Sequence, residues 1–329
     1  MIEFLCALRE CMMTNTLEKY FLNATESAAI AAAAWIGLGD GKAADGAAVE
    51  AMRNVFDNVP FDGRVAIGEG ERDDAPMLWI GEPLGSMKGE LEALKIDIAV
   101  DPLECTNHVA SDLPNAMAVL AAAPRGALLH APDCYMDKIS GPKELNGEIS
   151  LDAGTAYNVE AACAALGKES NELKVVVMDR PRHKDLIKEL DEYNVNVIKI
   201  GDGDITAALD AADPKSTIDM LMGIGAAPEG VITATALRGL DAPFEGRLIF
   251  KNKGHRERAE KMIEGDIERL WSRDELCTSD DSIFIGSGVC NGRTKGVDMS
   301  NKGFSIVHSE IIDVINKEHK FVTSEKIFN

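Results

Sequence analysis

The chain has 329 residues, of which 46% are hydrophobic and 27% are charged, a composition typical of a folded globular protein rather than a disordered one. A formal net charge of −21 disfavours binding to nucleic acid or to an anionic membrane surface. No apolar run approaches the roughly 20 residues that span a bilayer, and we expect no signal peptide. Seven scattered cysteines without a C-x-x-C pair favour a reducing compartment, so we expect a cytoplasmic protein.

The first half of the chain predicts two helices followed by short strands. An Ala-rich helix is expected over residues 26–36, with Thr25 as its cap and a glycine-rich segment after its end. A second helix is expected after Asp45, where apolar residues follow helical spacing. Strands are expected at residues 65–67 and 96–100, and residues 116–123 fit either a helix or a buried strand.

The second half alternates strands with helices, which predicts an α/β layer containing some parallel strands. Strands are expected at residues 175–178, 195–200, 218–222 and 247–250. Helices are expected over residues 184–193, 205–211, 229–238 and 256–271. A polar, turn-rich stretch suggests a soft boundary, with residues 1–160 and 161–329 as two halves of one compact unit.

The sharpest chemical signal is D-P-L-E-C-T at residues 101–106. An apolar run brings Asp101 to a strand end, and Pro102 turns the chain, so the carboxylates of Asp101 and Glu104 can meet beside the Thr106 hydroxyl. Hard cations such as Mg²⁺ and Mn²⁺ prefer oxygen ligands, so this group suits a metal ion that holds a phosphate. The plainer alternative is a capped turn with a solvated glutamate.

Further acidic residues could join such a site. Glu69 and Glu71 share a face on extended backbone, and the glycines around Glu69 allow a close approach of a ligand. Asp45 precedes a predicted helix, and Glu229 lies in the glycine-rich segment 223–230. An acidic surface turn, a helix N-cap and an ordinary helix start are the respective alternatives.

Residues suited to phosphate and sugar follow strands in the second half. Arg180 and Arg182 come directly after a strand, where two arginines can clamp a phosphate. Asp202 and Asp204 flank a glycine after the next strand and suit sugar hydroxyls. A salt-bridged loop and a helix cap are the alternatives. Because ligands of α/β sheets gather at strand ends, the joint order of these motifs indicates one site.

Together these motifs resemble a known family. D-P-L-E-C-T after an apolar strand, with G-E-G-E upstream, is similar to the lithium-sensitive, inositol-monophosphatase-like phosphatase superfamily. Within it, the chain resembles the class II fructose-1,6-bisphosphatases from about residue 25 to residue 291. That likeness is carried by A-D-G-A-A-V at 44–49, A-P-M-L at 75–78, A-P-D-C-Y-M at 131–136, P-R-H at 181–183 and G-A-A-P-E-G at 225–230.

The resemblance implies an α/β fold built as a layered α/β/α/β/α sandwich, with a metal-binding phosphatase half at 1–160 and a sugar-phosphate-binding half at 161–329. It implies Mn²⁺- or Mg²⁺-dependent hydrolysis of the 1-phosphate of fructose 1,6-bisphosphate to fructose 6-phosphate and phosphate, in gluconeogenesis. Some members also accept sedoheptulose 1,7-bisphosphate. The family also suggests a homo-oligomer, a tetramer, acting on small sugar bisphosphates.

The resemblance also assigns roles to individual residues. Asp45 and Glu69 are implied as ligands of one metal ion, and Asp101, Glu104 and Glu229 as ligands of another. Catalytic roles are implied for Thr106, Glu71 and Asp101. Substrate contacts are implied at Glu104, Cys105, Thr106, Tyr135, Arg180, Pro181, Arg182, Asp202, Gly203, Asp204 and Ala226.

Two residues depart from the family pattern, since Cys105 and Ala226 stand where many members have glycine. A side chain at position 105 disfavours a positive φ, and we hypothesise that oxidation of Cys105 blocks the site; a tolerated small residue is the alternative.

Three other functions remain open. The first is a phosphatase of inositol phosphates or nucleotide bisphosphates. The second is a nucleotide-cofactor oxidoreductase, although Pro228 replaces the third glycine of G-x-G-x-x-G in segment 223–230. The third is a metal or sugar-phosphate sensor without turnover.

Overall fold

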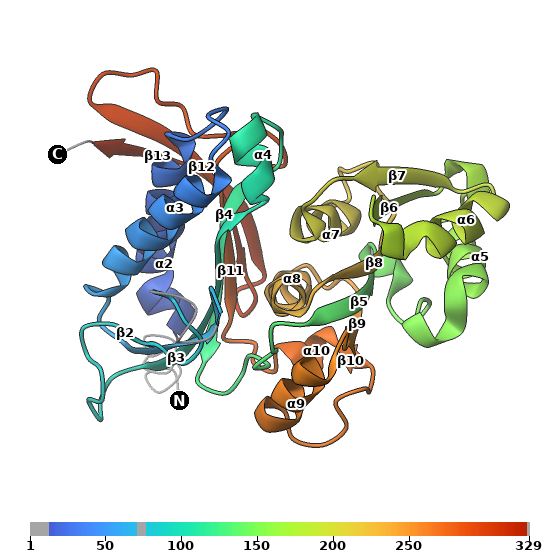
Figure 1. Cartoon of the computed structure of the whole chain (residues 1–329), viewed down its shortest axis with the longest axis horizontal. Coiled ribbons are helices and arrows are strands. Elements are labelled where there is room, and N and C mark those ends of the chain that lie inside the picture. The colour runs from blue at the N-terminus through green and yellow to red at the C-terminus, as the bar shows by residue number, and fades with distance from the viewer. Residues whose placement is uncertain (1–12, 71–76, 328–329) are drawn as a thin grey trace. The chain divides into compact units, whose positions relative to one another are not determined.

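A computed structural model describes residues 13–70 and 77–327 (Figure 1). These residues form two compact units: the first ends at residue 128 and resumes at residue 278, and the second consists of residues 129–277. This division differs from the halves 1–160 and 161–329 that the sequence suggests, because strands near the C-terminus join the sheet of the first unit.

The first unit is built on a seven-stranded sheet with the order β13-β12-β11-β4-β3-β1-β2. Its strands are β1 (Asp62–Ile67), β2 (Pro83–Leu84), β3 (Lys95–Glu104), β4 (Met117–Pro124), β11 (Ile283–Gly288), β12 (Phe304–Asp313) and β13 (Glu318–Ile327). β1 and β3 are parallel, and every other pairing in this sheet is antiparallel. The ambiguous stretch 116–123 is therefore a strand, and β4 is buried along nearly its whole length.

Helices α2 (Met13–Ala33) and α3 (Gly41–Phe56) pack on each other, and α2 also lies against β3, β4 and β11. Buried apolar residues of these helices and of one face of the sheet form one continuous core. A short helix, α4 (Thr106–Ser111), follows β3 directly.

Both predicted helix starts in this unit are wrong. Thr25 lies inside α2, where its hydroxyl donates to the Leu22 carbonyl and accepts from Ser287. The N-cap of α3 is Asp40, which accepts a hydrogen bond from the Ala43 amide, so Asp45 lies inside the helix rather than capping it. The glycines and alanines around Asp45 do not indicate where the helix begins, so the sequence does not identify Asp40 as its N-cap.

The second unit contains a six-stranded mixed sheet with the order β10-β9-β5-β8-β6-β7. Its strands are β5 (Tyr135–Ser140), β6 (Lys174–Met178), β7 (Asn196–Ile200), β8 (Met220–Ala226), β9 (Phe244–Ile249) and β10 (Trp271–Ser272). β6 is parallel to both β7 and β8, as the strand–helix alternation predicts. The α/β class predicted from the sequence is thereby confirmed.

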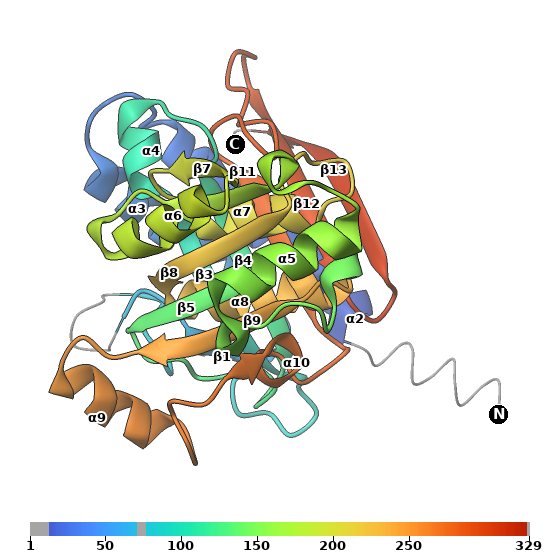
Figure 2. The ribbon, with the colours of Figure 1, turned by 90° about the vertical axis from the view of Figure 1, so that its right-hand side faces the viewer.

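Helices cover both faces of this sheet: α5 and α6 lie on one side, and α7 and α8 on the other (Figures 1 and 2). The helices are α5 (Gly154–Leu166), α6 (Lys184–Glu192), α7 (Asp204–Ala212), α8 (Ala227–Gly239), α9 (Lys253–Met262) and α10 (Arg273–Leu276), with short 3₁₀ turns η1 (Lys143–Leu145), η2 (Leu151–Ala153), η3 (Ser170–Glu172) and η4 (Pro181–His183).

One predicted helix of this unit is too long. The helix expected over residues 256–271 ends at Met262, and Trp271 belongs to a strand. Gly265, with φ of 90°, lies between them in a conformation that helices do not use. No helix within residues 13–70 and 77–327 has the length and apolar character needed to cross a membrane.

Candidate active site

Carboxylates gather at neighbouring strand ends in the first unit. Glu69 follows β1, and Asp101 lies near the end of β3, which is parallel to β1. Burial, and then repulsion from Asp101 and Asp45, raises the pKa of Glu69 to about 8. Burial also raises the pKa of Asp45. The structure thus brings two of the predicted ligands, Asp45 and Asp101, close enough to repel a third, Glu69, an arrangement that a divalent cation would stabilise.

A β-bulge shapes the end of β3. Asp101 pairs with Val119, and Glu104 pairs with Met117, so this strand carries one extra residue. The strand therefore continues past Val100, rather than stopping at Asp101 as predicted. Within the bulge, the Leu103 amide donates to Asp101 Oδ1 at 3.0 Å. The bulge explains how two carboxylates three residues apart lie on one strand end without a full turn.

The segment after the bulge is fixed by local hydrogen bonds and burial. The Thr106 hydroxyl donates to the Leu103 carbonyl at 3.0 Å, and Glu104 is only 3% exposed. Glu104 accepts from the Cys105 thiol, with 3.9 Å between sulfur and oxygen. All the candidate ligands are carboxylates, and this oxygen-only donor set fits a hard cation such as Mg²⁺ or Mn²⁺.

Cys105 adopts the left-handed conformation, with φ of 65° and ψ of 46°. The sequence indicates that a side chain disfavours positive φ here, and the backbone takes it nevertheless. Its thiol is buried, with 4% of the residue exposed. A left-handed residue other than glycine costs roughly 1–2 kcal/mol. The chain tolerates this cost at the point where β3 passes into α4.

Cys105→Val should lower the free energy of unfolding by about 1–2 kcal/mol or more, because β-branched side chains fit left-handed backbone worst. The measurement is urea unfolding followed by circular dichroism. Cys290→Val is the matched control, since Cys290 is also a buried thiol of this unit but is not among the residues with positive φ. Equal destabilisation by both substitutions would show that volume, not backbone conformation, decides the effect.

In the second unit, Arg182 and Tyr135 lie together with a lysine that the sequence reasoning missed. Nε and Nη2 of Arg182 both donate to the Ile224 carbonyl, at 2.8 and 2.6 Å. The same guanidinium lies over the Tyr135 ring at 5.1 Å, and Lys251 Nζ lies 3.5 Å from the centroid of that ring. Two cations around one phenol suit an anionic group such as a phosphate. No local motif marks Lys251, which reaches Tyr135 from beyond β9.

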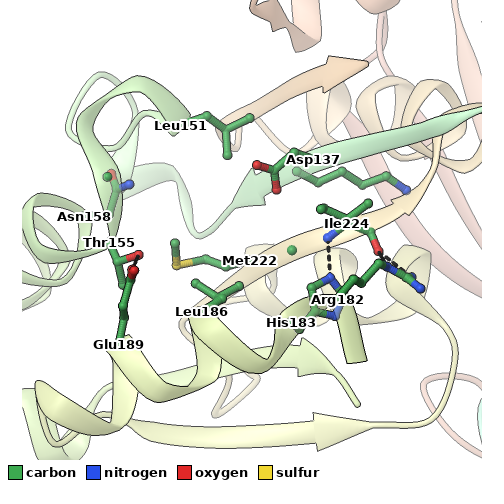
Figure 3. Close-up of a pocket in the computed structure, with 13 residues that line it drawn as sticks. Asp137, Leu151, Thr155, Asn158, Arg182, His183, Leu186, Glu189, Met222 and Ile224 are labelled. Atoms are coloured by element: carbon green, nitrogen blue, oxygen red, sulfur yellow. Dashed lines mark hydrogen bonds between the residues drawn. The ribbon is translucent and has the colours of Figure 1, made fainter. Parts of the chain in front are cut away.

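His183 connects the segment 180–182, which carries Arg180 and Arg182, to two strands of the sheet by hydrogen bonds. Its Nε2 accepts from the Ile224 amide at 2.7 Å (Figure 3). Its Nδ1 donates to the Met178 carbonyl, 2.7 Å away. Burial lowers the pKa of His183, which favours this neutral imidazole. The η4 turn, which carries Arg182 and follows Arg180, is thereby fixed to both β6 and β8.

Asp202 and Asp204 have different surroundings. Asp202 accepts from the Gly203 amide at 3.2 Å and is partly exposed. Asp204 is 3% exposed and accepts from Lys138 Nζ at 2.6 Å. Of the two, Asp202 is the more accessible to a sugar, and Asp204 neutralises a buried lysine. Lys138 carries no motif in the sequence.

Glu229 lies in the first turn of α8 and accepts from the Ala226 amide at 3.3 Å. An ordinary helix start is the alternative that the sequence offers to a metal-ligand role for Glu229, and this contact is of that kind. It involves one oxygen of the carboxylate, Oε2. The segment 223–230 does follow a strand and open a helix, as predicted. Ala226 itself has φ of −73°, so its side chain causes no backbone strain.

A pocket of about 220 Å³ lies beside the arginine segment in the second unit (Figure 3). Arg182 and His183 line it together with apolar side chains of Leu186, Met222 and Ile224. The pocket is lined as well by Asp137, Lys138, Leu151, Gly154, Thr155, Asn158, Glu189 and Gly223. Burial raises the pKa of Asp137. The pocket therefore shares Arg182 with the cationic surface around Tyr135.

The predicted site residues thus fall in both units. The first unit carries Asp45, Glu69, Asp101, Glu104, Cys105 and Thr106, and the second carries Tyr135, Arg180, Pro181, Arg182, Asp202, Gly203, Asp204, Ala226 and Glu229. Glu71 lies outside the described residues.

Residues 15–326 match the family model described as bacterial fructose-1,6-bisphosphatase, glpX-encoded. A "D-fructose 1,6-bisphosphatase class 2/sedoheptulose 1,7-bisphosphatase" of Synechococcus sp. (strain JA-2-3B'a(2-13)) is 44% identical over 301 residues, covering 85% of this chain and 86% of that protein. A protein of the same description, numbered 2, from Acaryochloris marina (strain MBIC 11017) is 39% identical over 337 residues, covering 96% of this chain and 97% of that protein.

Among solved structures, an inositol monophosphatase from Anabaena (Nostoc) sp. PCC 7120 aligns with a TM-score of 0.30 and 13% identity, covering 60% of this chain and 72% of that chain.

Proposed function

Because the chain belongs to the bacterial, glpX-encoded fructose-1,6-bisphosphatase family, we propose that it hydrolyses fructose 1,6-bisphosphate to fructose 6-phosphate and phosphate. The carboxylates around Glu69 carry this proposal, since burial, and then repulsion from Asp101 and Asp45, raises the pKa of Glu69 to about 8. A divalent cation would relieve that repulsion. Sedoheptulose 1,7-bisphosphate is a second substrate, because relatives at 39–44% identity are described by both activities.

The proposed metal ligands are Asp45, Glu69, Asp101, Glu104 and Glu229. A bound Mn²⁺ or Mg²⁺ supplies charge neutralisation of the transferring phosphoryl group and a more acidic water. Asp101 is held for this role by the Leu103 amide, and the Thr106 hydroxyl lies close to it in the chain, where it can bind the phosphate or the water. Glu71 supports the metals or the water in this proposal.

The distal phosphate is assigned to Tyr135, Arg180 and Arg182, with Lys251 as an added cation. Asp202 and the backbone of Gly203 and Ala226 are assigned to the sugar hydroxyls. The backbone at Pro181 and the segment Glu104 to Thr106 complete the substrate contacts. We further propose a cytoplasmic homo-oligomer, a tetramer, that acts in gluconeogenesis.

Arg182→Met should raise KM for fructose 1,6-bisphosphate by about 10–100-fold, because a hydrogen bond to a charged group contributes roughly 1.5–3 kcal/mol. The kcat should change little, since the distal phosphate is held equally in the ground and transition states. Lys184→Met is the matched control, an exposed cation on the first residue of α6. An unchanged KM in Arg182→Met would remove Arg182 from the substrate site.

The proposed function is tested by phosphate release from a substrate panel with Mn²⁺, Mg²⁺ or a chelator. The panel contains fructose 1,6-bisphosphate, sedoheptulose 1,7-bisphosphate, inositol 1-phosphate and a nucleoside bisphosphate. We expect release from the two sugar bisphosphates and none with the chelator. Preference for inositol 1-phosphate or the nucleotide would overturn the substrate assignment, and metal binding without any release would indicate a sensor.

A further inference from the structure

A fully buried lysine lies in the middle of β5. Lys138 is 1% exposed, and its strand neighbours Met136 and Ile139 are buried apolar residues. A buried charge is costly unless it is paired. Lys138 Nζ donates to Asp204 Oδ2 at 2.6 Å, and Asp204 is itself 3% exposed. The pair joins residues 66 positions apart in the sequence.

The same ammonium group lies beside a proposed metal ligand. Lys138 Nζ is 3.6 Å from Glu229 Oε2, the oxygen that also accepts from the Ala226 amide. One oxygen of Glu229 therefore accepts a hydrogen bond from the Ala226 amide and lies at ion-pair distance from the Lys138 ammonium group, which belongs to a different element. A carboxylate has two oxygens, so fixing one of them sets the direction of the other.

Two glycines of the G-A-A-P-E-G segment make room for this pair. A Cβ on Gly225 would lie 1.8 Å from Asp204 Oδ2 and 3.0 Å from Lys138 Nζ. A Cβ on Gly230 would lie 2.5 Å from Met136 Sδ and 3.4 Å from Lys138 Cε. Gly225, which is part of the dinucleotide-like glycine pattern, and Gly230, which lies beyond it, thus allow the close packing of the buried pair.

We propose that Lys138, neutralised by Asp204, is a positioning residue for Glu229 that orients its carboxylate for the metal ion. This inference rests on the proposed function of Glu229 as a ligand. A lone lysine would repel a divalent cation, but the Lys138–Asp204 pair is neutral overall and orients Glu229 without adding net positive charge. Outer groups that orient a ligand typically change metal affinity by 10–100-fold.

The test measures Mn²⁺ binding without substrate, by electron paramagnetic resonance of the free ion. The main variant is the double substitution Lys138→Met with Asp204→Asn, which removes both charges and leaves no unpaired ion. Its dissociation constant for Mn²⁺ should rise by about 10–100-fold. The matched control is Lys168→Met with Asp219→Asn, which removes another 2.6 Å ion pair of the same unit and should leave Mn²⁺ binding unchanged.

Asp204→Asn alone is a second variant, because it keeps Lys138 and its contact with Glu229. It should also weaken Mn²⁺ binding, since the lysine charge is then uncompensated. Wild-type affinity in both the double variant and Asp204→Asn, with weaker binding in Glu229→Gln, would overturn the inference and leave the proposed function intact. A wild-type protein that binds no Mn²⁺, or a Glu229→Gln variant with wild-type affinity, would instead overturn the ligand role of Glu229 and the inference with it.

Discussion

Asp101→Asn should lower phosphate release from fructose 1,6-bisphosphate by a factor of about a thousand or more, because metal-based charge stabilisation contributes several kcal/mol to such reactions. Asparagine keeps the shape of aspartate and an oxygen that can accept from the Leu103 amide, so the bulge in β3 should survive. The substitution removes the negative charge of Asp101, which repels Glu69 and would help to bind the metal ion. The measurement is steady-state phosphate release over a range of Mn²⁺ concentrations.

Glu50→Gln is the control for Asp101→Asn. Glu50 is an exposed carboxylate on α3 of the same unit, and its loss changes the net charge equally. Phosphate release by Glu50→Gln should match that of the wild type. Substantial phosphate release by Asp101→Asn, with the same metal dependence as the wild type, would contradict a role for Asp101 in binding the metal.

Arg293→Met should lower the free energy of unfolding by about 3–5 kcal/mol, the usual cost of removing one partner from a buried ion pair. Arg293 makes a bidentate contact with Glu310, at 2.6 Å from Nε and 2.5 Å from Nη2. The side chain of Glu310 is fully buried, and that of Arg293 is 3% exposed. His319 also contacts Glu310, at 2.8 Å. Urea unfolding of the purified protein measures the effect.

The double variant Arg293→Met with Glu310→Leu is the control, since it removes the buried charge together with its partner. It should recover most of the lost stability. Equal loss in both variants would show that Arg293 acts through packing instead of charge.

The pair also sets a pH dependence of stability. Burial raises the pKa of Glu310, but hydrogen bonds from His319 and Arg293 outweigh it, so the net pKa is lowered. Ionised Glu310 therefore stabilises the folded protein fully above pH about 4.3, the pKa of glutamate in an unfolded chain. This stabilisation is lost as the pH falls through the lower pKa of Glu310 in the folded protein.

The sequence predicts the strands and helices whose apolar runs are long or regularly spaced. The strand–helix alternation of the second unit is correct for this reason, apart from the end of α9. Boundaries set by side-chain contacts were missed: Thr25 looks like a cap, but its hydroxyl bonds within α2 and to Ser287. Local sequence carries no sign of a partner more than 250 residues away.

The site follows the same rule. Asp101 and Glu104 stand in one short motif, so their proximity is readable from the chain. Lys138 has no motif, because its importance depends on Asp204, which reaches it through the folding of the sheet. Residues after 291 offer no chemistry that can be interpreted from the sequence, yet they supply Glu310 and two strands of the first sheet.

The interrupted layout of the first unit has a consequence for how the protein is made. β4 pairs with β11, and the whole second unit is inserted between these two strands. A chain emerging from the ribosome begins with its N-terminal residues, so residues 129–277 are complete before the first sheet can receive β11, β12 and β13. The first unit, which carries Asp45, Glu69 and Asp101, is thus the first to begin synthesis and the last to complete its sheet.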